Sequence, residues 1–188
     1  MNSSLRLIVR SVLAAFATFV VCGVALADPS PVTSAKAVIS PTTGNTVAGT
    51  VEFSTVDGGI KVVADITGLP PGKHGFHIHE FGDISDAAKA MKTGGHYDPT
   101  GTKHHMLMEG TTMDESTGHH AGDLGNLTAD DSGKAHLEVT LTGVTLLGAT
   151  NPIVGRAVII HEKADDGGQP TGNAGGRLGQ GVIGIAKP

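Results

Sequence analysis

Short apolar segments alternate with turn residues along most of this chain. Segments rich in Val, Ile and Thr lie at residues 46–55, 59–66, 74–81, 135–141, 153–161 and 181–186. Asp57-Gly58 between the first two segments is typical of a β-hairpin turn. No segment carries a sustained helical period, and residues 85–92 have room for one short helical turn at most. The pattern predicts an all-β protein of about eight antiparallel strands, folded as a sandwich or barrel.

Two long stretches, residues 82–127 and 162–179, lack the alternation that is typical of strands. The first is rich in His, Asp and Gly, and the second in Gly with two Asp residues. Loops of this length in a compact domain usually carry function. We therefore expect two long functional loops on an all-β scaffold.

Residues 1–27 have the features of a signal peptide. Arg6 and Arg10 precede an almost unbroken apolar run over residues 11–24, and Ala25-Leu26-Ala27 matches the small-x-small pattern of a cleavage site. The run is shorter than the roughly 20 residues of a membrane-spanning helix, which favours cleavage over a retained anchor. We expect a periplasmic or secreted protein with no stable membrane association after cleavage.

The remaining chain divides into a flexible lead-in at residues 28–35 and one β-domain at residues 36–188. Cys22 is the only cysteine and lies in the predicted signal peptide, so the mature chain forms no disulfide. A lipid anchor on Cys22 is disfavoured, because Val21 is bulkier than the residues that usually precede a lipidated cysteine.

Cleavage also makes the chain more acidic. The predicted signal peptide contains two of the 13 Lys and Arg residues and none of the 18 Asp and Glu residues. The mature chain therefore has a formal charge of −7, from 11 basic and 18 acidic residues. This charge argues against nucleic acid or an anionic membrane surface as a partner.

All ten histidines fall between positions 74 and 161, and this clustering favours a metal site over a solvated surface. His77 and His79 are two apart in a predicted strand, so both side chains lie on one face while Phe76 and Ile78 point to the core. Such a pair converges on one ion or is simply exposed, and the pair alone does not distinguish these readings.

Further metal-ligand candidates follow in the first long loop, where His96, His104, His105, His119, His120 and Asp123 occur within 28 residues. Imidazoles with one carboxylate suit a tetrahedral zinc site, and a solvated polar loop is the alternative. His161 ends an apolar segment at the rim of the predicted sheet. A single histidine at a strand end is more often structural than a metal ligand.

Five motifs in order resemble the copper/zinc superoxide dismutase family. They are HGFHIHEFGD at 74–83, HYDP at 96–99, HAGDLGNL at 120–127, GRAVIIHEKADD at 155–166 and TGNAGGRLGQGVIGIA at 171–186. The resemblance covers essentially the whole mature chain. It implies a Greek-key β-barrel, copper and zinc as cofactors, and superoxide as the substrate anion.

The same resemblance implies the role of each site residue. Copper is expected on His77, His79, His96 and His161, and zinc on His96, His104, His120 and Asp123. His96 would bridge both ions and act in catalysis. Asp165 would link a ligand of each metal, and Arg177 would hold the substrate anion. His74 matches a structural position, and His119 and His136 match no family role. The double His104-His105 leaves the zinc ligand open, and counting eight residues from His96 favours His104.

The chain departs from the family pattern in three places. The family's disulfide is absent, with Ile84 and Gln180 near the expected positions. Losing such a bridge typically costs about 2–5 kcal/mol of stability. We therefore expect the metal-free protein to be looser and to gain much of its order when it binds metal. The loop at residues 165–177 contains no lysine, which leaves Lys92, Lys103 and Lys163 as candidates for attracting the anion. Of these three lysines, we expect Lys103 to contribute most to attracting the anion.

The third departure is a long segment at residues 105–118, which contains Met106, Met108 and Met113. Thioethers beside imidazole suit Cu(I), but a flexible loop with core-filling methionines is the favoured reading.

Three functions are therefore compared. The retained ligands and Arg177 favour dismutation of superoxide to oxygen and hydrogen peroxide. A copper-binding or copper-delivering module with the same fold and little turnover is the alternative. A structural adhesion-type sandwich would not require the histidines. A homodimer is compatible with the family, but the altered disulfide region gives no basis for choosing an oligomeric state.

Overall fold

The computed structural model describes residues 31–104 and 118–187. The predicted signal peptide at residues 1–27 lies outside the described residues, and so do His105, Met106, Met108 and Met113. Within the described part the strands are β1 (Ser34–Pro41), β2 (Ala48–Val56), β3 (Gly59–Thr67), β4 (Gly72–His79), β5 (Asp123–Ala129), β6 (Ala135–Leu141), β7 (Ala157–His161), β8 (Arg177–Val182) and the two-residue β9 (Gly184–Ile185). No described helix is long and apolar enough to cross a membrane.

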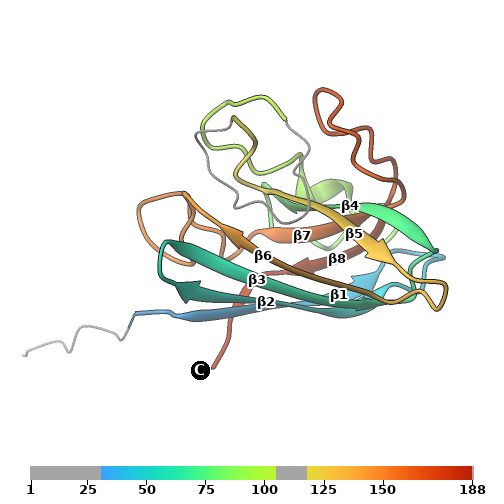
Figure 1. The fold of residues 1–188 in the computed structure, drawn as a ribbon, viewed down its shortest axis with the longest axis horizontal. Helices are drawn as coiled ribbons and strands as arrows, with labels where there is room; N and C mark the ends of the chain where they lie inside the picture. The colour runs from blue at the N-terminus through green and yellow to red at the C-terminus, as the bar shows by residue number, and fades with distance from the viewer. Residues whose placement is uncertain (1–30, 105–117, 188) are drawn as a thin grey trace, which may run out of the picture. The chain divides into compact units, whose positions relative to one another are not determined.

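The strands form an antiparallel Greek-key barrel, as the sequence predicts. The pairing order is β5-β4-β7-β8-β1-β2-β3-β6, and β9 pairs with β1. Figure 1 shows two layers, one made of β1, β2, β3 and β6 and the other of β4, β5, β7 and β8. The end of β1 joins the layers, because Ser40 pairs with Gln180 of β8. On the other side β5 and β6 lie next to each other and nearly close the barrel (Figure 1).

Alternating apolar positions build the core between the layers. In β3 the side chains of Ile60, Val62, Ala64 and Ile66 are buried, and the residues between them are more exposed. Phe76 and Ile78 of β4 are fully buried in the same core, as their alternation with His77 and His79 predicts.

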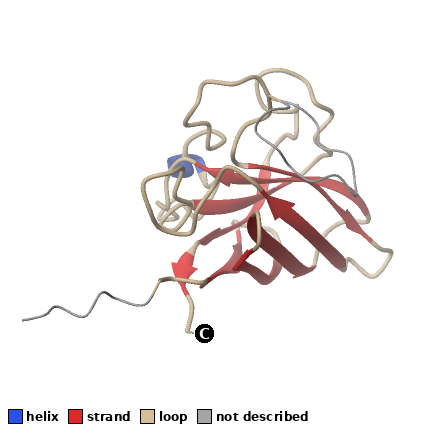
Figure 2. Ribbon diagram, turned by 60° about the vertical axis from the view of Figure 1, so that its left-hand side comes forward, coloured by secondary structure: helices blue, strands red, loops and turns tan. Residues whose placement is uncertain are grey.

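Both faces of β4 are covered, and this is what positions the site. His77 and His79 are as buried as Phe76 and Ile78, although they lie on the opposite face. The long loops supply the cover: Figure 1 shows residues 80–104 and 162–176 above the layer that contains β4, β7 and β8. Figure 2 shows the loops gathered on this side of the strands, with the short 3-10 helix η1 (Met91–Thr93) among them.

Four elements differ markedly from the sequence expectation. β8 begins at Arg177, inside the stretch of residues 162–179 that was predicted as loop, rather than at residue 181. β1 begins at Ser34, inside the predicted lead-in of residues 28–35, because its buried side chains are small alanines and one isoleucine and give a weak apolar signal. β5 begins inside residues 82–127, a stretch predicted as loop, and continues to Ala129. Its Asp, Gly and Asn residues are unusual for a strand, and Gly125 has φ +84°. β7 begins at Ala157 rather than at residue 153, because residues 153–156 form a turn.

Candidate metal centre

Two neighbouring strands bring three histidines together. His77 and His79 lie on β4, and His161 ends β7, which pairs antiparallel with β4. The isolated bridge between His79 and His96 adds a fourth ring from the first long loop. His77, His79, His96 and His161 thus form a first group, which we call the four-histidine group. All four are buried, and each offers one nitrogen within 4.8 Å of the others.

Hydrogen bonds fix which nitrogen of each ring faces this group. His77 donates from Nε2 to Asp165 Oδ2 at 2.9 Å, and His79 donates from Nδ1 to Gly94 O at 2.9 Å. His161 donates from Nδ1 to Gly175 O at 3.4 Å. A neutral imidazole has one donor and one acceptor nitrogen. The other nitrogen of each ring therefore presents a lone pair.

Among the described residues, no N–H or O–H group donates a hydrogen bond to these lone pairs. His77 Nδ1 and His96 Nε2 are buried without a hydrogen-bond partner in this part of the chain. His79 Nε2 and His161 Nε2 lie 3.4 Å apart. Burial, reinforced by neighbouring histidines, lowers the pKa of His79 and of His161 well below the ordinary value, so both rings stay neutral. Four converging imidazole lone pairs fit a transition-metal ion of the kind that imidazole prefers.

A second group contains three histidines and one carboxylate, and we call it the histidine–aspartate group. Its members are His96, His104, His120 and Asp123, with one ligand atom of each within 4.8 Å of the others. Asp123 Oδ1 lies 2.9 Å from His96 Nδ1, and Asp123 Oδ2 lies 3.0 Å from His104 Nδ1. His120 Nδ1 lies 3.4 Å from His96 Nδ1. Three imidazole nitrogens around one carboxylate match a tetrahedral zinc-type donor set.

In the metal-free protein, a proton on His104 balances the negative charge of Asp123 in the histidine–aspartate group. Burial opposes a charge on His104, but hydrogen bonds to Asp123 and Asp165 outweigh it and raise the pKa of His104 to about 9. Burial also opposes ionisation of Asp123. The hydrogen bonds from His104, His120 and His96 outweigh that effect and hold the pKa of Asp123 well below its ordinary value. The site is therefore an ionised carboxylate with one cationic partner, His104, and a bound cation can take the place of that proton.

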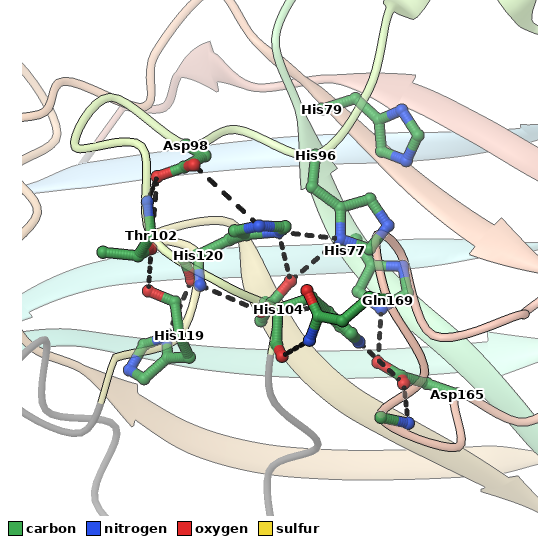
Figure 3. Close-up of polar contacts among 12 residues, drawn as sticks. His77, His79, His96, Asp98, Thr102, His104, His119, His120, Asp165 and Gln169 are labelled. Atoms are coloured by element: carbon green, nitrogen blue, oxygen red, sulfur yellow. Dashed lines mark hydrogen bonds and ion pairs between the residues drawn. The ribbon is translucent and has the colours of Figure 1, made fainter.

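His96 belongs to both groups. Its Nδ1 faces Asp123, and its Nε2 is the unpartnered atom on the side of the four-histidine group. Burial lowers the pKa of His96 to about 4, although Asp123 acts in the opposite direction. Figure 3 shows His96 between His79 on one side and His120 on the other. The His96 ring also stacks on His77, with centroids 3.9 Å apart.

Asp165 contacts one histidine of each group. It accepts hydrogen bonds from His77 Nε2 at 2.9 Å and from His104 Nε2 at 2.8 Å (Figure 3). Asn126 of β5 holds the backbone of Asp165 through bonds of 2.8 and 3.0 Å. Gly172 approaches this carboxylate so closely that an added Cβ would lie 2.0 Å from Oδ1. The loop sequence therefore leaves space for Asp165 to reach both rings.

Arg177 lies beside the four-histidine group at the start of β8. Its Nη1 donates to Thr93 Oγ1 at 2.8 Å and to Ala90 O, and its Nη2 donates to Gly94 O at 2.7 Å. The side chain is half-buried, and burial lowers its pKa from the ordinary value. Arginine remains charged after such a shift. The guanidinium is thus a fixed positive group.

A pocket borders three histidines of the four-histidine group. His79, His96, His161 and Arg177 all line it. The lysine that lines the pocket is Lys89, which the sequence analysis did not single out. Lys92 bonds instead to Ser85 Oγ at 3.0 Å, and Lys103 and Lys163 are not among the described lining residues. The pocket geometry thus gives no support to the expectation that Lys103 contributes most to attracting the anion.

The remaining described histidines stand outside both groups. His74 places its two ring nitrogens 2.9 Å from His161 O and 2.8 Å from Pro70 O, so neither nitrogen is available to a metal. His119 bonds through Nδ1 to His120 O, and His136 pairs with Asp65 on the exposed surface.

The fold and these two groups define a Greek-key barrel protein with adjoining metal-binding sites that share one histidine. A family model described as copper/zinc superoxide dismutase matches residues 47–183. The chain belongs to this family. The crystal structure of the clock protein EA4 is similar to it, with a TM-score of 0.70 and 40% identity over 82% of this chain and 95% of that chain.

Proposed function

We propose that this protein catalyses the dismutation of superoxide to molecular oxygen and hydrogen peroxide. The observation that carries the proposal is the combination of a four-histidine group, a shared His96 and a fixed Arg177 at one pocket. We assign copper to His77, His79, His96 and His161, and zinc to His96, His104, His120 and Asp123. The donor sets support this assignment, since imidazole suits both ions and a carboxylate suits zinc.

Bound copper would supply a reversible one-electron change, which zinc does not. The overall reaction transfers one electron from one superoxide to another. The first becomes oxygen, and the second takes up two protons and becomes hydrogen peroxide. The chain's own residues must therefore bind an anion, exclude other reactions and deliver protons.

Arg177 would bind the anion. Its guanidinium is held by Thr93 and by two backbone carbonyl oxygens, so the charge is already in place before substrate arrives. Preorganised charge of this kind stabilises an anion without a reorganisation cost. A planar guanidinium with several donors suits a small diatomic anion.

His96 would hold a proton at Nε2. That atom lies in the four-histidine group and has no partner among the described residues, while Nδ1 faces the histidine–aspartate group. A proton on Nε2 would lie next to the pocket where peroxide forms. Asp165 would keep His77 and His104 oriented, as hydrogen-bonded carboxylates do for metal ligands.

Lys89 would attract the substrate over a longer range. The mature chain is acidic, so a local positive group at the pocket has to offset the unfavourable field. Lys89 and Arg177 together supply two such charges.

The alternative is a copper-binding or copper-delivering module with little turnover. An assay of superoxide loss on the metal-loaded protein distinguishes the two. Rapid superoxide loss supports the dismutase. Full copper and zinc content without activity supports the alternative.

We also propose that the chain is exported after cleavage behind Ala27, to the periplasm or the medium. The apolar run and the Ala25-Leu26-Ala27 site support this proposal. Amino-terminal sequencing of the protein recovered from the producing cell tests it, with Asp28 as the expected first residue. A protein that starts at Met1 would contradict it.

A further inference from the structure

The loop that holds Arg177 needs an anchor other than a disulfide. This loop, residues 82–94, presents Ala90 O, Thr93 Oγ1 and Gly94 O to the guanidinium. Cys22 is the only cysteine of the sequence, so no covalent bridge can join the loop to β8. Any movement of the loop would move the acceptors of Arg177.

Gln180 of β8 bonds to this loop. Its Nε2 donates to Ile84 O at 3.2 Å and to Asp86 O at 3.3 Å, which uses both amide N–H groups. Backbone carbonyls only accept hydrogen bonds, so the amide nitrogen must face them. The side chain is 3% exposed. Gln180 Oε1 has no hydrogen-bond partner among the described residues, so the two N–H donors carry the contact with the loop. Burying these donors without acceptors would be costly, so they depend on the loop carbonyls.

The acceptors of Gln180 lie at the start of a well-defined turn. The Asp86 carboxylate accepts bonds from the backbone N–H groups of Ala88, Lys89 and Met91, at 3.0 to 3.2 Å. Ala90 N donates to Asp86 O at 2.8 Å. The turn leads directly to Ala90 O, which accepts from Arg177. Gln180 and Arg177, three residues apart on β8, thus hold the two ends of one loop.

We propose that Gln180 is a positioning residue whose amide anchors residues 82–94 to β8 and so keeps Arg177 in place without a disulfide. Reductants do not open amide hydrogen bonds, so the anchor is independent of the redox state of the surroundings. The anchoring itself stands on the hydrogen bonds and burial described above. Its consequence for turnover rests on the proposed dismutase function.

Hydrogen exchange of the metal-free protein tests the anchor without any activity measurement. Gln180→Met keeps the length of the side chain and removes both donors. We expect the amides of Ala88, Lys89 and Met91 to lose protection about tenfold or more, because the loop opens more easily. Thr43→Val is the matched control, since it removes one exposed bond to Ala87 O, at 3.3 Å, and leaves the backbone bond there intact. Wild-type protection in Gln180→Met would overturn the proposal.

A second measurement needs no variant. The two Nε2 protons of Gln180 should exchange about tenfold or more slowly than those of a glutamine in an unstructured peptide. Exchange at the peptide rate would overturn the anchor even if Gln180→Met did not fold.

The functional consequence is measured separately on the metal-loaded protein. We expect Gln180→Met to lower the second-order rate constant for superoxide loss about tenfold with unchanged copper and zinc content. Lost protection with an unchanged rate would overturn the link from the anchor to Arg177. An inactive wild-type protein would overturn the dismutase proposal but leave the exchange result decisive for the anchor.

Discussion

Asp165 Oδ2 lies 2.9 Å from His77 Nε2, and this single contact determines which nitrogen of His77 faces the four-histidine group. The carboxylate accepts a hydrogen bond from Nε2, so the proton stays on Nε2 and Nδ1 carries the lone pair. The other oxygen of Asp165 accepts a hydrogen bond from His104 Nε2, while His104 Nδ1 lies 3.0 Å from Asp123 Oδ2. One side chain thus orients a candidate ligand of each metal.

Asp165→Asn should weaken both metal sites. The amide can still contact one ring, but it cannot accept from both. Loss of such a partner typically lowers metal affinity about 10–100-fold. Competition titrations with chelators measure the copper and zinc affinities. Asp166→Asn is the control, because Asp166 is exposed and its carboxylate accepts hydrogen bonds only from Gly168 and Asn173 among the bonds described. Equal affinities in Asp165→Asn and wild type would contradict the role of Asp165.

Arg177→Ile should reduce activity while leaving the metals in place. The guanidinium contacts the loop and lines the pocket, but it belongs to neither metal group. Loss of a positive charge at the pocket typically slows the capture of an anion about tenfold or more. Arg177→Lys keeps the charge without the fork of donors and should be intermediate. Rates of superoxide loss at equal metal content provide the measurement, and an unchanged rate in Arg177→Ile would remove its assigned role.

Lys89→Glu should slow superoxide loss and reverse its salt dependence. With Lys89 present, added salt should lower the rate, because screening is strong beyond about 10 Å at 0.1 M. The control is Lys61→Glu, which makes the same charge change on β3, in the other layer of the barrel. If both variants lost the same activity, net charge rather than Lys89 would control the rate.

His104→Ala should abolish zinc binding, whereas His105→Ala should retain it. His104 joins the histidine–aspartate group and contacts both Asp123 and Asp165. His105 lies outside the described residues. Zinc analysis of the two purified variants decides between them. Retained zinc in His104→Ala together with zinc loss in His105→Ala would reverse the assignment.

Removing the metals should lower the melting temperature by about 8–16 °C. A ligand at a thousand times its Kd stabilises a fold by about 4 kcal/mol. For a domain of this size that corresponds to about 8–16 °C. Calorimetry of the metal-free and metal-loaded protein tests this. An equal melting temperature for the two forms would show that the loops are ordered without metal.

The barrel and the main part of the site could be predicted from the sequence, because strand alternation carries direct information. His77 and His79 face away from Phe76 and Ile78 as a two-residue period requires. The order of the family motifs brought His96, His120, Asp123 and His161 into consideration together. β1 and β5 were missed because small residues and Gly, Asn and Asp weaken the strand pattern.

The supporting contacts could not be predicted, because they depend on how loops fold over the barrel. Asn126 holds Asp165 from a strand that was predicted as loop. Lys89 reaches the pocket only because the turn after Asp86 directs it there. Gln180 stood near an expected cysteine, but its two donors to Ile84 and Asp86 become visible only in the structure.

The most direct test of the dismutase proposal is metal analysis combined with an assay of superoxide loss on the mature chain. We predict one copper and one zinc per chain, bound at the two groups that share His96, together with rapid, metal-dependent superoxide loss that stops when copper is removed. Full occupancy by both metals with no superoxide loss above the buffer rate would contradict it.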